Sequence, residues 1–463
     1  MVFSSITFLS VFLPVVFLLH CFLPGIKVKN GLLIIASLLF YAYGEPVYVL
    51  LMILSAFLNY LLGRLVGADT RWKKTGVVSA VILNIGLLTV YKYAGFLVEL
   101  LNATGLLNVP VPKIALPIGI SFFTFQALSY VIDVYRGTVS AQRNFFKVLL
   151  YISFFPQLIA GPIVKYHDIE KEIDERQISI EEMAAGMRRF AAGLSKKVLI
   201  SNVLGLTADT LFAADPGCIN ILTAWIAAVS YLLQIYFDFS GYSDMALGMG
   251  RMFGFHFREN FQYPYAADSI REFWRRWHIS LSGWFREYLY FPLGGNRKGR
   301  GRTVVNKFIV FFCTGLWHGA NMTFVIWGLY HGFFLMLEEY LPKTKKKGRC
   351  MAAVKHLYTM LVVTVGFVMF RADTVSQGLF FIREMFTGLH FEASAVSMAV
   401  TQLTPLYLVV LSAAVVSSGP VKKYMERWKR YEAISSVCSI AGMILCILSL
   451  AGSTYNPFIY FRF

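Results

Sequence analysis

The sequence predicts an all-α, polytopic integral membrane protein. Hydrophobic residues make up 57% of the chain and charged residues only 15%, whereas soluble domains average about 25% charged residues. The apolar residues are also gathered into runs, and short polar or basic segments separate these runs. A soluble α-helical protein would need a polar, solvent-facing side on each of these segments, and the runs do not have one. We therefore place most of the chain in a membrane.

The lengths of the apolar runs indicate the kind of helices to expect. A helix that crosses the hydrocarbon core needs about 20 mainly apolar residues, although about 17 can suffice. Several runs are shorter, so some helices should be tilted, broken or re-entrant. We expect roughly 10–13 transmembrane or re-entrant helices in a single membrane domain, residues 1–463. The runs lie at residues 6–22, 31–43, 47–62, 76–90, 198–212, 222–237, 306–317, 322–337, 357–370, 406–416 and 434–450.

The positions of the basic residues predict the orientation. No Lys or Arg precedes Lys27, so the first run lacks the basic start of a secretory signal. Cytoplasmic loops of membrane proteins are enriched in Lys and Arg, which places the N-terminus outside and Lys27 inside. The loops at residues 102–112 and 207–220 have neither residue and should face outward. The clusters expected in the cytoplasm are residues 71–74, 136–147, 188–197, 286–302, 343–349 and 422–430.

One apolar segment does not fit this alternation. Residues 148–164 lie between two of the cytoplasmic clusters, so the segment should enter the membrane and return. It contains Pro156, Gly161 and Pro162, which suit a broken helix. Irregular backbone is tolerated at membrane depth only where protein shields it or where it lines a cavity. We therefore expect a break inside this segment.

Charge and cysteine content argue against several classes of protein. The net charge is +17, but the excess lies in short loops, where orientation and anionic lipid headgroups account for it. Membrane lipid, and not nucleic acid, is the expected partner. The six cysteines form no CxxC pair and lie mostly in apolar runs, so we expect free thiols and neither a disulfide framework nor a metal site. The stretch LGGNRKGRGR matches no nucleotide-binding pattern.

Residues 236–332 carry the candidate chemistry, because ionisable side chains interrupt the apolar pattern there. Such residues are costly in a membrane and by default indicate function. His318 has almost wholly apolar neighbours, so burial should keep it neutral and able to accept a proton from a hydroxyl. On these grounds a helix-packing role for His318 is an equal alternative. His331 lies about 20 Å further along a continuous helix, so packing is its expected role.

His278 lies in the amphipathic stretch WRRWHISLS, which is too polar for a lipid-facing helix. Arg275, Arg276 and Arg286 are close to it in sequence. Arginine side chains match the geometry of phosphate groups, so a phosphate-rich cytosolic substrate could dock there. The basic run at residues 297–302 is more simply explained as an ordinary cytoplasmic loop.

Long motifs then carry a family resemblance. Residues 272–297 read EFWRRWHISLSGWFREYLYFPLGGNR, and residues 314–332 read TGLWHGANMTFVIWGLYHG. Further motifs are LPIGISFFTFQALSYVIDVYRG, FPQLIAGPIVKY, YFDFSGYSDMALGMGRMFGF and NPFIYFRF, at residues 116–137, 155–166, 236–255 and 456–463. Together they resemble the membrane-bound O-acyltransferase (MBOAT) family. Within that family they resemble the bacterial branch of alginate O-acetylases and peptidoglycan O-acetyltransferase membrane subunits.

The resemblance implies a helix bundle around a central funnel that crosses the bilayer. It implies that an acyl-CoA enters from the cytosol and that the acyl acceptor approaches from the other side. The essential histidine of the family matches His318, and the second characteristic position matches His278. Glu287 stands where an aspartate is expected, which keeps the carboxylate.

These inferences combine into a hypothesis about mechanism. His318 acts as the general base on an acceptor hydroxyl, and His278 either donates a hydrogen bond to the oxyanion or orients the acceptor. The phosphates of the donor lie near the three arginines named above. Asn321 is a weaker candidate for substrate binding. Asp238 and Asp244 either contact the histidines without touching the substrate, or pack as polar residues between helices.

The resemblance also implies the reaction and the partners. Acetyl-CoA is the expected acyl-donor substrate, and no cofactor or metal is expected. A separate extracytoplasmic acyltransferase would place the acetyl group on a polysaccharide, and the chain would lie in the bacterial cytoplasmic (inner) membrane. Two alternatives stay open at this point: D-alanyl transfer to teichoic acid, and a transporter or flippase in which the histidines line a proton path.

Overall fold

The computed structural model describes residues 1–68, 71–105, 108–159, 161–340 and 348–459. It is 76% helical, without strands in the described residues, which confirms the all-α class. Most of the basic cluster at residues 343–349 and the end of the NPFIYFRF motif lie outside the described residues. The chain forms two compact units, Met1–Phe190 with Ser243–Arg258, and Ala191–Tyr242 with Glu259–Phe463. The expectation of a single domain stays a prediction.

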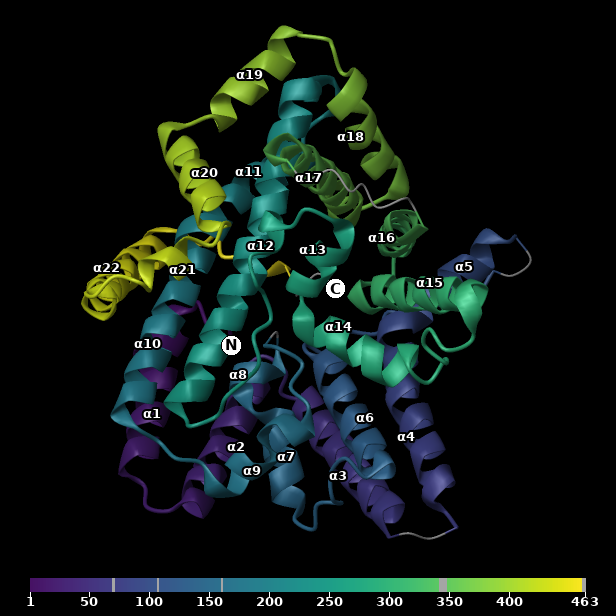
Figure 1. Cartoon of the computed structure of the whole chain (residues 1–463), viewed down its shortest axis with the longest axis vertical. Coiled ribbons are helices and arrows are strands. Elements are labelled where there is room, and N and C mark those ends of the chain that lie inside the picture. The colour runs from purple at the N-terminus through teal and green to yellow at the C-terminus, as the bar shows by residue number, and fades with distance from the viewer. Residues whose placement is uncertain (69–70, 106–107, 160, 341–347, 460–463) are drawn as a thin grey trace. The chain divides into compact units, whose positions relative to one another are not determined.

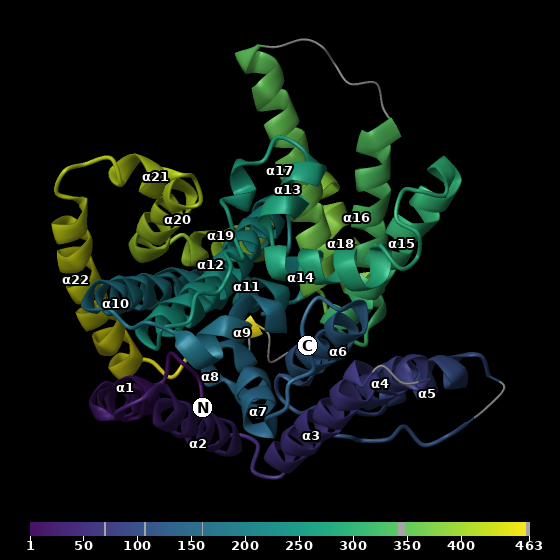
Figure 2. The ribbon, with the colours of Figure 1, turned by 60° about the horizontal axis from the view of Figure 1, so that its bottom comes forward.

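Short and medium-length helices build the first unit. In the ribbon, α3, α4 and α6 lie side by side (Figures 1 and 2). Its helices are α1 (Leu13–Phe22), α2 (Ile26–Ala42), α3 (Tyr48–Gly67), α4 (Lys73–Leu88), α5 (Ala94–Ala103), α6 (Ile120–Arg136), α7 (Phe145–Ser153), α8 (Phe155–Leu158), α9 (Tyr166–Glu175) and most of α10 (Ile180–Ser195).

The second unit contains the residues in which the sequence places the chemistry. In both ribbon views α16 and α17 lie side by side, and α13 packs against both (Figures 1 and 2). Its helices are α11 (Asn202–Phe212), most of α12 (Ile221–Met252), α13 (Ile270–Arg276), α14 (Ile279–Phe285), α15 (Gly299–His318), α16 (Met322–Tyr340), α17 (Arg349–Arg371), α18 (Val375–Thr387), α19 (Ala393–Gln402), α20 (Pro405–Ser417), α21 (Val421–Met425) and α22 (Tyr431–Gly452).

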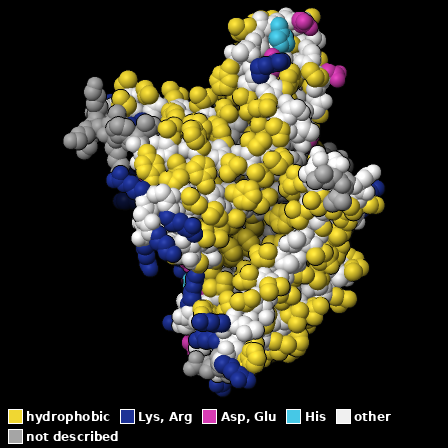
Figure 3. Space-filling view, turned by 90° about the vertical axis from the view of Figure 1, so that its right-hand side faces the viewer, with side chains coloured by type: hydrophobic (Ala, Val, Ile, Leu, Met, Phe, Trp, Pro, Cys, Tyr) yellow, Lys and Arg dark blue, Asp and Glu magenta, His cyan; other side chains and the backbone are white. Residues whose placement is uncertain are grey.

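Several of these helices are long and apolar enough to cross a membrane. Among the described residues five meet that requirement, and α19 with α20, bent by 66°, forms a sixth if the pair is one span. The five are Tyr48–Gly67, Lys73–Ala103, Ile221–Met252, Arg349–Arg371 and Tyr431–Gly452. Hydrophobic side chains cover most of one face of the molecule (Figure 3). The protein is a multi-pass membrane protein, and the higher helix count, which includes shorter segments, stays a prediction.

The break expected within residues 148–164 is present. Helix α7 ends at Ser153, and Phe154 adopts a non-helical backbone with ψ of 112° before the single turn of α8. The interruption is shielded by protein, because the Tyr151 hydroxyl donates to the carbonyl oxygen of Val164 at 2.9 Å and Phe155 is fully buried. The sequence therefore located a real interruption of the helix.

A buried ion pair anchors the C-terminal segment in the second unit. The Lys197 ammonium lies 2.7 Å from the Asp238 carboxylate, and both side chains are 1% exposed. Lys197 also donates to the carbonyl oxygen of Pro457, and Asp238 accepts from the backbone N–H of Ile459 at 2.9 Å. Residues 457–459 are thereby held against α12, where Asp238 lies.

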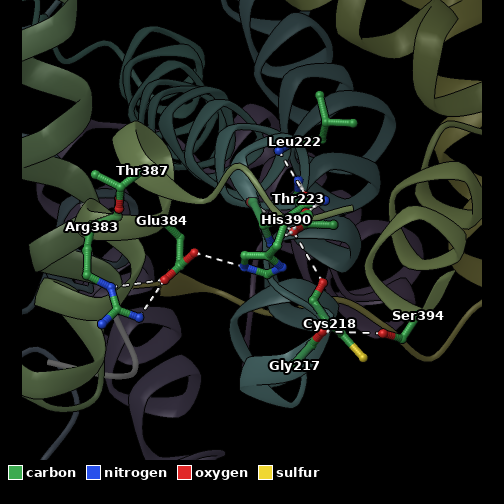
Figure 4. Close-up of polar contacts among 10 residues, drawn as sticks. Gly217, Cys218, Leu222, Thr223, Arg383, Glu384, Thr387, His390 and Ser394 are labelled. Atoms are coloured by element: carbon green, nitrogen blue, oxygen red, sulfur yellow. Dashed lines mark hydrogen bonds and ion pairs between the residues drawn. The ribbon is translucent and has the colours of Figure 1, made fainter. Parts of the chain in front are cut away.

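Polar contacts also tie the turn before α12 to the end of α18 (Figure 4). The buried Glu384 carboxylate accepts from Arg383 at 2.6 Å and lies 3.2 Å from Nε2 of His390. The side-chain amide of Asn220 donates to the carbonyl oxygen of His390 at 3.0 Å. The backbone N–H of Ile221 donates to Gly388 at 2.9 Å. The first residue of α12 is thus fixed to the loop between α18 and α19.

The Lys197–Asp238 pair leads to a stability prediction. Lys197→Met leaves a buried carboxylate without its counter-ion, which should cost about 3–5 kcal/mol of unfolding free energy. In Lys197→Met/Asp238→Asn no unpaired charge is left, so we expect the double variant to be more stable than the single one. Thermal or denaturant unfolding of the purified proteins measures the difference. Equal stability of the two variants would contradict a coupled pair.

Candidate active site

The site begins at a strained turn between α13 and α14. His278 has φ 44° and ψ 56°, in the left-handed region. This backbone conformation costs a non-glycine residue roughly 1–2 kcal/mol and persists only where the surroundings enforce it. Strain of this kind concentrates at functional sites.

Asn260 supplies the enforcing contacts. Its side-chain oxygen accepts from the backbone N–H of Ser280 at 3.2 Å and from the hydroxyl of Ser280 at 2.9 Å, and it lies 3.1 Å from Nδ1 of His278. Its backbone carbonyl accepts from the N–H of Ile279 at 2.9 Å. Asn260 is itself 1% exposed, so water does not compete for these bonds. One buried amide therefore holds the whole turn.

These contacts also select the tautomer of His278. The backbone N–H of Ser280 can only face an acceptor, which identifies the contacting atom of Asn260 as the oxygen. The tautomer of His278 with a proton on Nδ1 donates to this oxygen, 3.1 Å away. Burial lowers the pKa of His278 to about 3, because desolvation penalises the imidazolium. The neutral ring consequently has Nε2 as its hydrogen-bond acceptor.

His318 is the last residue of α15 and lies in an aromatic setting. Its ring centroid is 5.0 Å from that of Trp317 and 5.1 Å from those of Trp327 and Phe370. Close packing of α15 on α16 sets this position. A Cβ on Gly315 would lie 2.3 Å from the carbonyl oxygen of Phe324. The helices can approach this closely only where a side chain is absent.

Both histidines line one cavity of about 520 Å³, a volume in the usual range for ligand pockets. Trp317 also lies close to both rings, at 5.8 Å from His278 and 5.0 Å from His318. The rest of the lining comes from α13, α14, α15, α16 and the residues after α14. It consists of Arg271, Trp274, Arg275, Trp277, Ile279, Leu281, Ser282, Gly283, Phe285, Arg286, Tyr290, Lys307, Val310, Phe311, Thr314, Leu335 and Glu339.

The charge of this cavity is strongly positive. Four basic side chains and one carboxylate line it. The Glu339 carboxylate faces two of the bases, Arg271 at 3.5 Å and Lys307 in a direct ion pair. Within the described part of the chain Arg275 forms no ion pair, and Arg286 has only a 3.9 Å contact with Glu287. Arg275 and Arg286 are thus available to an anionic ligand.

A second cavity, of about 150 Å³, lies beyond the aromatic wall next to His318. Its lining includes Phe370, whose ring contacts those of His318 and Phe324 at 5.1 and 4.8 Å. The first cavity reaches Glu339 near the end of α16, whereas the second is lined by Phe324 near its start, about 22 Å away along the helix. The lining residues are Asp209, Tyr231, Gln234, Asn321, Phe324, Phe370, Arg371, Ala372, Asp373, Pro457 and Ile459.

The structure separates the residues that the sequence grouped together. Arg275 and Arg286 lie with the histidines, but Arg276 does not line the cavity and instead pairs with Glu272. Asn321 lines the second cavity. Asp238 anchors the C-terminal segment as described above. Asp244 belongs to the other unit and pairs with Arg189 at 2.8 Å.

His331 and several unpredicted residues complete the description. The His331 ring is fully buried against Trp274 and Trp327 and does not line either cavity, which matches the packing role expected for it. Sequence reasoning missed Asn260 and Lys307. Asn260 lies in a loop without periodicity, and nothing in the sequence marks it. Lys307 could have been selected from the sequence, since it is a lone cation at the start of an apolar run.

Comparisons with known proteins agree with the sequence motifs. A model of the MBOAT, membrane-bound O-acyltransferase family, matches residues 122–370. The chain is 38% identical over 493 residues to a probable alginate O-acetylase of Pseudomonas putida, with all of both chains covered. It is 34% identical over 422 residues to a peptidoglycan O-acetyltransferase of Helicobacter pylori, covering 83% of this chain and 80% of that protein. It is 29% identical over 268 residues to a teichoic acid D-alanyltransferase of Bacillus subtilis, covering 55% of this chain and 67% of that protein.

Asn260 offers a test of the turn. Asn260→Leu removes the shared acceptor and should lower acyl-transfer kcat about 100-fold by misplacing His278, with little change in the KM of the donor. Asn260→Asp keeps the oxygen and should retain more activity. It should also move the acid limb of the pH–rate profile upward, because a carboxylate beside Nδ1 raises the pKa of His278. Full activity in a folded Asn260→Leu protein would contradict this role.

Proposed function

This chain belongs to the membrane-bound O-acyltransferase family, and from that premise we propose that it takes acetyl groups from cytosolic acetyl-CoA. We further propose that it relays them across the cytoplasmic membrane for O-acetylation of an extracytoplasmic polysaccharide. The family and the relatives identify an O-acyltransferase enzyme. The donor, the relay and the bacterial inner membrane are parts of the proposal.

The observation that carries the proposal is the shared cavity with its basic lining. CoA has a thioester at one end of a long arm and phosphates at the other. Arg275, which has no ion pair among the described residues, and Arg286, with only the 3.9 Å contact to Glu287, provide guanidinium groups for the phosphates. The two histidines line the same cavity, where the thioester would lie. The basic cluster at residues 286–302 is expected in the cytoplasm, which is the side from which acetyl-CoA would come.

The chemical step assigns one role to each histidine. His318 removes the proton of an acceptor hydroxyl, whose oxygen forms a bond to the thioester carbonyl carbon. The carbon–sulfur bond then breaks, and the proton passes from His318 to the departing CoA sulfur. Because neutral His278 has an acceptor at Nε2, it suits orientation of the hydroxyl better than donation to an oxyanion. The sequence had left these two roles for His278 open.

The acetyl group is favoured over a D-alanyl group by the extent of similarity. The two O-acetylating relatives match 100% and 83% of this chain, whereas the D-alanyltransferase matches 55%. The basic lining of the cavity also suits the phosphates of CoA. A separate extracytoplasmic acyltransferase would complete the transfer to the polysaccharide.

Replacement of His318 tests the function directly. His318→Ala should lower acetyl-CoA-dependent acyl transfer by about 10²–10⁴-fold, the usual range for loss of a general base. Purified protein in detergent or liposomes, with radiolabelled acetyl-CoA, provides the measurement, and His331→Ala serves as a matched control for a buried histidine outside the cavity. Undiminished transfer by folded His318→Ala, or no acetyl-CoA turnover by wild type, would refute the proposal.

The arginines provide a separate test of the donor. Arg275→Gln and Arg286→Gln, each made singly, should raise the KM for acetyl-CoA roughly tenfold or more, since one lost contact to a charged group weakens binding by about 1.5–3 kcal/mol. The KM for S-acetylpantetheine, which lacks the nucleotide phosphates, should hardly change. Arg276→Gln is the matched control, because Arg276 lies outside the cavity lining. Equal changes for both donors would place the phosphates elsewhere.

A further inference from the structure

We propose that Glu339 is a displaceable counter-ion, which pairs with Lys307 and Arg271 in the empty cavity and gives up its place to a phosphate of the acyl donor. This inference rests on the proposed function, because it concerns how the donor binds in the same cavity. It makes Glu339 a residue that sets the affinity of the protein for CoA.

The three side chains meet in the wall of the cavity that contains the histidines. The Glu339 carboxylate on α16 forms a direct ion pair with the Lys307 ammonium on α15, and it lies 3.5 Å from the Arg271 guanidinium on α13. All three residues line the cavity, and their side chains are between 21% and 40% exposed. Each therefore has surface that a bound ligand can reach.

Glu339 is shared between the two bases. Among the described residues it is the only carboxylate that forms an ion pair with Lys307 or Arg271, so a net positive charge remains even while the pairs are formed. The phosphates of CoA together carry more charge than one carboxylate and offer more acceptor oxygens. A phosphate can therefore replace Glu339 on both bases.

The backbone of α13 is held by the neighbouring glutamate and not by Glu339. Glu338 accepts from the backbone N–H groups of Ile270 and Arg271, at 2.6 and 3.0 Å, which satisfies free donors at the start of this helix. Glu338 lies outside the cavity lining. The ion pairs of Glu339 are to side chains, which can exchange partners without disturbing the helix.

The position of the ion pair in the cavity suits the phosphate end of the donor. The lining residues of α15 are Lys307, Val310, Phe311, Thr314 and His318. They recur every three or four residues and so lie on one face of the helix. Lys307 is about 16 Å from His318 along this face. CoA carries its phosphates at the far end of a long arm, so a thioester beside His318 leaves them well away from the histidines, where Lys307 lies.

A counter-ion that can return also favours release of the product. After acyl transfer, CoA leaves with the same phosphates that the donor brought. Unpaired charges in a partly buried site are costly, and Glu339 removes that cost by pairing again with Lys307 and Arg271. Without the carboxylate the protein should hold CoA more tightly.

Binding of free CoA tests this role without any acyl transfer. Glu339→Gln keeps the shape of the side chain and removes its charge, so that the two bases no longer have to leave a carboxylate. The Kd for CoA, measured by calorimetry on purified protein in detergent, should fall about three- to tenfold, the value of a partly exposed ion pair. Pantetheine, which lacks the phosphates, should bind both proteins equally.

Lys307 provides an independent variant. Lys307→Gln should weaken the binding of CoA, and in that background Glu339→Gln should bring a smaller gain, because one of the two bases that it frees is already absent. This double-mutant cycle separates a local exchange of partners from a general effect of charge. Glu426→Gln is the matched control, since Glu426 is an exposed glutamate that pairs with Lys422 outside the cavity, and this variant should bind CoA as wild type does.

Each outcome decides the inference. Tighter binding of CoA by folded Glu339→Gln, with a smaller gain in the Lys307→Gln background, supports the exchange. Unchanged or weaker binding by Glu339→Gln overturns it, since Glu339 would then only hold the two bases in place. An equal gain in both backgrounds, or wild-type affinity in Lys307→Gln, overturns it as well. Failure of the proposed donor would appear separately, as absence of CoA binding by wild type, and refutes both proposals.

Discussion

The amide of Asn260 is the contact on which the site depends most. A left-handed backbone at His278 is unfavourable in isolation, yet it ends α13, begins α14 and brings His278 to the cavity. In an apolar interior a polar group without a partner is costly, so the bonds to Asn260 are worth more than they would be in water. The same bonds determine which nitrogen of His278 carries its proton. A residue outside the motif thus sets both the position and the chemistry of one inside it.

The second histidine is positioned by packing and not by polar contacts. Gly315 lets α15 approach the backbone of α16, and aromatic rings then surround His318 on several sides. Interiors are packed as densely as organic crystals, so the ring has little freedom to reorient. The hydrogen bonds of Asn260 therefore position one histidine of the cavity, and close helix packing positions the other.

The two cavities differ in the charge of the residues that line them. One has a basic lining and contains the histidines, and the other has a small excess of acid and opens beyond Phe370. Residues 457–459, held by the buried Lys197–Asp238 pair, contribute Pro457 and Ile459 to the wall of the second cavity. Asp238, a candidate from the sequence for supporting the histidines, pairs with Lys197 and holds the segment that lines the second cavity.

Local pattern was enough for the membrane class and for the interruption near Phe154, and it selected His278 and His318, which line one cavity. These features follow from hydropathy, backbone breakers and motifs, all of which are properties of neighbouring residues. Pattern did not separate Arg275 from Arg276, because adjacent residues on a short helix point in different directions. It selected Asn321 together with His318 as candidate site residues, although the two line different cavities.

The sequence by itself determined the class of protein and its family, and it selected the two histidines as candidates, since each of these depends on composition or on contiguous motifs. Only the tertiary structure decided that Asn260 holds His278, that Asp238 pairs with Lys197, and that Glu339 pairs with Lys307. Such contacts join residues distant in the chain, and burial makes their hydrogen bonds and charges decisive. No local pattern records which distant groups will meet where water is excluded.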